Sequence, residues 1–113
     1  MVTMEDIKKM VELYQDELRY MHPFVNSNKF ADNSYRKWAC GEILKEIEKT
    51  KDLPFDITPL QLLNQFADKM KRYAYMNSKN SLAFTIASET AEYLIDEYWI
   101  LDRKKNERKV HII

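Results

Sequence analysis

Three carboxylates in the last third of the chain are spaced so that they could hold a metal ion. Glu89, Glu92 and Asp96 follow one another at intervals of three and four residues, which places them within one narrow arc of a helix. Like charges at this spacing destabilise a helix by a few tenths of a kcal/mol per pair, so a basic neighbour, a divalent cation or water must offset them. We interpret the arc as an ion-paired or solvated face, with a metal site as the alternative.

In type and spacing, Glu89 and Glu92 resemble the first half of the metal-binding motif of the all-helical nucleotide pyrophosphohydrolases of the MazG type. Those enzymes hold magnesium with an ExxE motif and a later ExxD motif. The second half has no counterpart here, because Asp96 lies on the same helix and no ExxD follows it. A metal-dependent hydrolase is therefore a third hypothesis, and we expect no resident metal or cofactor.

Two further residues belong to types that act as nucleophiles or bases, and each has a structural interpretation. Cys40 lies on the expected apolar stripe of its helix, where a cysteine behaves as a small hydrophobic residue. His22 precedes Pro23 at an expected helix end, where a cationic ring suits the negative end of the helix dipole. Neither has a catalytic partner at a recognisable spacing, so we expect binding rather than catalysis.

The elements that position these side chains are expected to be helical. A sheet protein of 113 residues needs several glycines for its turns, whereas this chain contains one. Hydrophobic residues make up 45% of the chain, which is enough for one packed core. The sequence therefore predicts an all-α fold, a small four-helix bundle in which residues 1–113 form a single domain.

Start and stop signals delimit the four helices. Thr3 and Asp6 form a capping box at the start of the chain. Thr58, Pro59 and Gln61 combine a cap, a proline at the first helical position and a glutamine at the third. The expected helices cover residues 3–22, 34–50, 58–77 and 81–101, and the last can continue into the tail.

Two segments outside these helices differ from them in character. Residues 22–33 lack a sustained period but carry apolar side chains, which predicts a packed loop between the first two helices. Residues 102–113 form a basic C-terminal tail with five basic and two acidic residues. We expect this tail to contribute little to folding, because a polar terminus makes few buried contacts.

Basic residues near the end of the third helix and in the tail form a candidate nucleic-acid surface, with a tyrosine ring able to stack on a base. Its members are Lys69, Lys71, Arg72, Tyr75, Lys79, Arg103, Lys104 and Lys105. However, 18 basic and 18 acidic residues cancel, so no global field attracts nucleic acid. Nucleic-acid binding is therefore the alternative function.

Trp38 and Gly41 mark a candidate surface for a protein partner. Trp38 points away from the apolar stripe of its helix, and Gly41, the only glycine, stands three residues later on the same flank. Either Phe24 and Phe30 of the expected loop cover Trp38, or Trp38 is a binding hot spot.

The last helix carries a second apolar stripe besides the one expected to face the core. Its members are Leu82, Ile86, Tyr93 and Ile100. One stripe suffices for a helix at the surface of a bundle, so a second indicates a central helix or an interface. We expect self-association as a homodimer, or binding to another protein, through this stripe. The alternative is that the segment 22–33 covers it.

Cysteine content and the N-terminal sequence bear on the cellular setting. A single cysteine excludes an intramolecular disulfide, which favours the reducing cytoplasm. The N-terminal residues lack the features of a signal peptide, and acidic residues interrupt the most apolar segment, so no membrane span is expected. The use of Lys, Asn, Tyr and Met is similar to that of small accessory proteins of low-GC bacteria and their phages. The sequence thus indicates a cytoplasmic accessory protein that acts by binding.

Overall fold

The computed structural model describes the backbone of residues 1–19 and 27–111 and the side chains of residues 1–19 and 32–107. Four α-helices make up most of it: α1 (Met4–Arg19), α2 (Ser27–Lys49), α3 (Pro59–Met76) and α4 (Ser81–His111). The short 3-10 helix η1 (Thr50–Asp52) extends α2. The described residues contain no strand, which confirms the predicted all-α four-helix fold.

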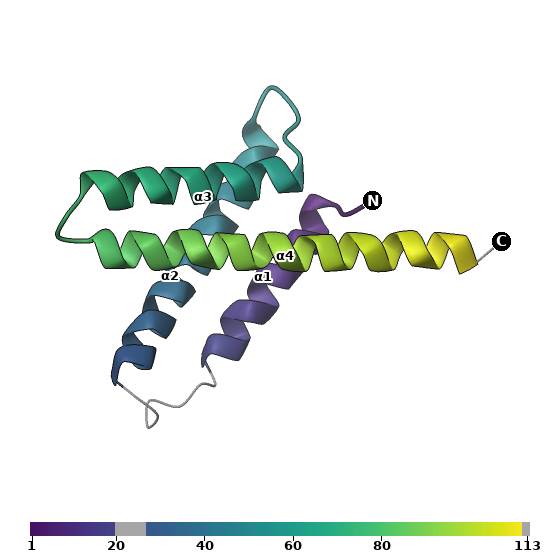
Figure 1. Cartoon of the computed structure of the whole chain (residues 1–113). Helices are drawn as coiled ribbons and strands as arrows, with labels where there is room; N and C mark the ends of the chain where they lie inside the picture. The colour runs from purple at the N-terminus through teal and green to yellow at the C-terminus, as the bar shows by residue number, and fades with distance from the viewer. Residues whose placement is uncertain (20–26, 112–113) are drawn as a thin grey trace.

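The helices form two antiparallel hairpins stacked as two layers (Figure 1). α3 and α4 lie side by side in one layer, and the hairpin of α1 and α2 crosses them obliquely in the other. The molecule measures 52 × 37 × 20 Å. Its smallest dimension matches two layers of helices, each about 10 Å in diameter. α4 therefore packs on α3 within its own layer and on α2 and α1 across the layers.

Both predicted capping boxes are present. At the start of α1, Asp6 N–H donates to Thr3 Oγ1 at 3.1 Å, and Thr3 N–H donates to the Asp6 carboxylate at 2.8 Å. At the start of α3, Gln61 N–H donates to Thr58 Oγ1 at 3.1 Å, and Thr58 N–H donates to Gln61 Oε1 at 2.9 Å. These bonds satisfy N–H groups that have no partner within the helix, which is why both helices begin where the sequence indicates.

Each helix contributes one buried stripe to the core. The stripes contain Ile7, Val11 and Leu18 of α1; Ala39, Cys40, Ile43 and Ile47 of α2; Leu62, Leu63, Phe66, Ala67 and Met70 of α3; and Ala87, Ala91 and Leu94 of α4. The small alanines of α4 allow the neighbouring helices to approach closely. None of the described helices combines the length and the apolar character needed to cross a membrane.

α2 begins earlier than the sequence predicts. Residues 27–33, expected to belong to a loop, form the first two turns of this helix. The segment contains neither glycine nor proline, so nothing in it stops a helix, and extending a formed helix costs far less than nucleating one. The rest of the predicted loop, and the predicted end of the first helix at His22, lie outside the described residues.

α4 runs through most of the predicted basic tail. This segment consists mainly of lysine, arginine and other good helix formers. With 31 residues, α4 is about 46 Å long, whereas the 18 residues of α3 span about 27 Å. α4 therefore projects beyond α3 (Figure 1). The radius of gyration is 15.5 Å, against about 13 Å for a compact domain of this length.

The tail also contacts the N-terminus, through bonds that the sequence does not predict. The Lys105 ammonium group donates to the Asp6 carboxylate and, at 3.2 Å, to the carbonyl oxygen of Met1. The helical path of α4 carries Lys105 back over the first turn of α1. Sequence periodicity cannot reveal this contact, because the two residues are 99 positions apart.

Candidate functional site

A groove runs between α1 and residues 93–104 of α4. At one end the rings of Tyr14 and Tyr93 pack with centroids 4.7 Å apart, and at the other end Asp6 binds Lys105. The two helices therefore run antiparallel along the groove. It consists of a hollow of about 360 Å³ and an adjoining one of about 60 Å³, which share Met10, Leu13 and Glu97 in their walls.

Large apolar side chains in this groove are open to water. The exposed fractions are 62% for Leu13, 42% for Tyr93 and 43% for Ile100. Met10 and Leu101, both partly buried, join these exposed side chains to the core. Burying one such side chain fully is worth roughly 1.5–3 kcal/mol, so the groove is an apolar surface that gains from being covered.

The charges around the groove are separated by sign. Glu17 lies at the Tyr93 end, whereas Lys9 and Lys104 lie at the Ile100 end. Asp6 also lies at the Ile100 end, but its charge is offset by Lys105. Glu97 stands between the two ends. The residues that line the groove are thus acidic at one end and basic at the other, whereas Arg36 of α2, outside the lining, acts to lower the pKa of Tyr14 at the acidic end.

The two tyrosines of the groove keep their phenolic protons at neutral pH. Burial raises the pKa of Tyr14 above its ordinary value. Burial also raises the pKa of Tyr93, and the negative charge of Glu97 adds to the effect. Both hydroxyl groups therefore stay protonated, and that of Tyr93 also hydrogen-bonds with Glu97.

The residues of the predicted second stripe of α4 lie in different environments. Tyr93 and Ile100 lie in the groove, and Leu82 is exposed about 27 Å away from Ile100 along the helix. Ile86 is only 5% exposed, so its assignment to an exposed partner-binding face is corrected. Ile86 lies two turns before Tyr93 on the same face of α4. The predicted stripe therefore contains one buried residue, Ile86, and three exposed residues, of which Tyr93 and Ile100 line the groove.

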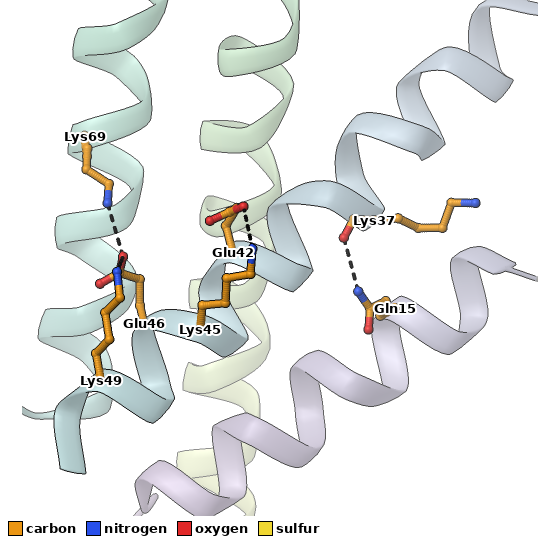
Figure 2. A network of polar contacts seen from close by, with 7 residues as sticks. All are labelled: Gln15, Lys37, Glu42, Lys45, Glu46, Lys49 and Lys69. Carbon is orange, nitrogen blue, oxygen red and sulfur yellow. Dashed lines mark hydrogen bonds and ion pairs between the residues drawn. The ribbon is translucent and has the colours of Figure 1, made fainter. Parts of the chain in front are cut away.

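Trp38 and Gly41 face different neighbours. The ring of Trp38 packs edge-on against Phe84 of α4 with centroids 6.2 Å apart, and it remains partly exposed. Gly41 lies against α1, since a Cβ atom placed on it would be 3.7 Å from Gln15 Nε2. The same Gln15 nitrogen donates to the carbonyl oxygen of Lys37 at 3.2 Å (Figure 2). Gly41 therefore belongs to the crossing of α1 and α2, and the side chains expected to cover Trp38 lie outside the described residues.

The carboxylate arc of α4 pairs with α3. Lys71 lies 2.7 Å from Glu92, and this contact raises the pKa of the lysine. Glu89 and Asp96 are exposed to solvent. Within the described part of the chain, no group of three or more aspartate, glutamate, histidine or cysteine side chains is placed to hold a metal ion.

The candidate nucleic-acid residues fall into two separate groups. Lys69, Lys71, Arg72, Tyr75 and Lys79 lie toward the turn between α3 and α4, whereas Arg103, Lys104 and Lys105 lie near the far end of α4 (Figure 1). Two of these lysines contact carboxylates, since Lys69 pairs with Glu46 and Lys71 with Glu92. Tyr75 is 93% exposed, as a stacking residue must be. The groups do not form one continuous basic surface.

Sequence reasoning missed the contribution of α1 to the groove. Leu13 does not belong to the buried stripe of α1, and an isolated apolar residue off a stripe is common. Only its position opposite Ile100 makes it part of a surface. Cys40 is fully buried, and burial raises the pKa of its thiol to about 12, which leaves it protonated at neutral pH.

Comparison of the chain with protein-family models, with curated proteins and with solved structures found no significant match.

Proposed function

We propose that the protein acts by binding a second copy of its own chain through the groove between α1 and α4. The observation that carries the proposal is the exposure of Leu13, Tyr93 and Ile100 together in one concave surface. A partner that covered them would remove a connected apolar area from water, which is the main driving force of protein association.

The distribution of charge favours a second copy as the partner. In a two-fold dimer the same surface meets itself, so each contact between two residues occurs twice. If two grooves pack antiparallel, the acidic end with Glu17 faces the basic end with Lys9 and Lys104 of the other copy. Such pairing of opposite charges sets the orientation of the two chains.

The proposed role is that of a small accessory protein that works by association rather than catalysis, in the cytoplasm as the sequence indicates. The protonated state of the buried Cys40 thiol supports this, because the thiolate is the nucleophilic form. The exposed and ion-paired state of the α4 carboxylates supports it as well.

Mass measurement in solution tests the proposal. Light scattering and sedimentation should show a dimer for the unmodified chain and a folded monomer for the double variant Leu13→Lys, Ile100→Lys. Leu82→Lys is the control, because Leu82 of α4 is as exposed as Leu13 but lies outside the groove. Circular dichroism confirms folding of each variant.

A monomeric unmodified chain at hundreds of micromolar would overturn the proposal, as would equal loss of dimer in the Leu82→Lys control. A salt-sensitive shift of labelled DNA or RNA by the monomeric double variant would favour the nucleic-acid alternative.

A further inference from the structure

A second pocket lies on the opposite side of α2 from α1, between the end of α2, the linker 53–57 and α3. Its volume of about 470 Å³ falls in the range of small-molecule sites, roughly 300–1,000 Å³. Apolar side chains from the linker and α3 line it: Leu53, Phe55, Ile57, Leu62 and Phe66. None of these residues belongs to the groove between α1 and α4.

The apolar lining has a buried floor and an exposed wall. Leu62 and Phe66 of α3 are buried in the core and present their edges to the pocket. Phe55 stands in the linker with 63% of its surface exposed. An exposed phenyl ring gains little of the free energy that its burial would release. A ligand with an apolar body that packs on this ring would bury it.

The polar rim of the pocket carries an excess of positive charge. Glu46 Oε1 lies 3.6 Å from Lys49 Nζ and 3.4 Å from Lys69 Nζ, so one carboxylate serves two ammonium groups (Figure 2). The Lys69 ammonium also lies 5.8 Å from the centre of the Phe66 ring, directly beside the apolar floor. One positive charge of this cluster is therefore left without a counter-charge.

Arg72 adds a second uncompensated cation. Its side chain lines the same pocket and forms no ion pair with any described residue. A guanidinium group presents a planar fork of N–H donors that matches the two oxygens of a carboxylate. The rim thus offers a carboxylate-binding group beside an apolar cavity.

From this juxtaposition we propose that the pocket binds a small amphipathic carboxylate, a medium-chain fatty carboxylate in its simplest form. Arg72 receives the carboxylate, with Lys69 as the neighbouring cation. The hydrocarbon chain lies along Leu62 and Phe66 and is covered by Phe55. A nucleic-acid strand fits this pocket less well, because its repeating phosphates need a row of cations rather than an apolar floor.

Titration with octanoate tests the proposal, with octanol as the neutral ligand of equal chain length. Calorimetry should show saturable binding of one octanoate per chain and binding of octanol weakened by about tenfold or more, since charge-assisted hydrogen bonds are worth about 1.5–3 kcal/mol. Amide chemical shifts should change around Leu53, Ile57 and Arg72.

Three variants separate the contributions. Arg72→Gln should weaken octanoate binding about tenfold and leave octanol binding unchanged, whereas Phe55→Ala should weaken both. Lys45→Gln is the charge-matched control, because Lys45 is an exposed α2 lysine that pairs only with Glu42 of its own helix and lies outside the pocket (Figure 2). This control should bind octanoate as the unmodified chain does.

Equal affinity for octanoate and octanol would overturn the proposal, and so would an Arg72→Gln variant with unchanged octanoate affinity. Chemical-shift changes confined to the groove between α1 and α4 would also overturn it. Repeating the titration on the Leu13→Lys, Ile100→Lys variant keeps this result independent of the oligomeric state.

Discussion

At the residue scale, Asp6 has two partners, of which the sequence reveals one. Its backbone and carboxylate complete the capping box with Thr3, and the same carboxylate binds Lys105 of α4. The hydrogen bond from Lys105 is the main cause that lowers the pKa of Asp6 from 3.8 to about 2, followed by the bond from the Thr3 N–H group. The ionised form of Asp6 is thus favoured by folding.

We expect Asp6→Asn to lower the free energy of unfolding at neutral pH by about 1 kcal/mol, a value limited by solvent screening at the surface. Because the folded pKa lies below the ordinary one, the stabilisation is complete above about pH 4 and is lost as the pH falls toward 2. Urea denaturation between pH 7 and pH 2 measures both effects.

Glu5→Gln is the control for this experiment, since Glu5 is an exposed acid in the same turn of α1. It should retain the acid-induced loss that Asp6→Asn removes. Identical pH profiles for Asp6→Asn and the unmodified chain would contradict the assignment.

The backbone conformation at Gly41 does not require a glycine. No glycine has a positive φ, and an added Cβ would meet Gln15 Nε2 at an ordinary contact distance of 3.7 Å. Glycine inside a helix costs about 0.5–1 kcal/mol relative to alanine. We therefore expect Gly41→Ala to raise the free energy of unfolding by that amount in urea denaturation. A loss of stability would instead show that α1 and α2 need the closer approach.

At the element scale, α4 organises the molecule. It packs on α3, is crossed by the other hairpin, and then continues past its partners (Figure 1). Among the described residues beyond Asp102, only Lys105 forms a hydrogen bond or an ion pair with α1 or with the residues that precede it. The stability contributed by the projecting end should therefore depend mainly on this residue.

We expect Lys105→Gln and truncation after Asp102 to lower the melting temperature by a similar amount, about 4 °C for a loss of about 1 kcal/mol. The double variant Asp6→Asn, Lys105→Gln should lose less stability than the sum of the two single losses, because both substitutions remove the same ion pair. A truncation much more damaging than Lys105→Gln would show that further contacts anchor the end of α4. Differential scanning calorimetry gives the comparison.

At the scale of the whole molecule, the separated charges of the groove predict how two chains meet. A two-fold dimer brings the Glu17 end of each chain to the Lys104 end of the other, so each pairing occurs twice. Orientation and salt dependence of association follow from this arrangement.

We expect Glu17→Lys or Lys104→Glu alone to weaken the dimer about fivefold at low salt, since two exposed pairs of about 0.5 kcal/mol each are lost. The double charge reversal should recover most of the affinity, because the opposite charges then face each other again. Sedimentation equilibrium at low and high salt measures these constants. Glu12→Lys, an exposed α1 change outside the groove, is the control. Failure of the double reversal to recover affinity would contradict the antiparallel arrangement.

The sequence by itself determined the secondary structure wherever local chemistry is strong. The capping boxes at Thr3 and Thr58, and the scarcity of glycine, specify helix starts and an all-helical chain through interactions between residues a few positions apart. The same local rules missed the first turns of α2, because a helix without stop signals extends even where its apolar pattern fades.

Only the tertiary structure decided which apolar residues face solvent and which charges are paired. Ile86 and Tyr93 lie on the same face of α4, yet Ile86 is buried and Tyr93 is exposed. Lys105 meets Asp6, and Arg72 comes to lie over an apolar pocket, through contacts between distant elements. Helical periodicity fixes the direction of a side chain relative to its own axis, whereas burial depends on where the neighbouring helices cross that axis.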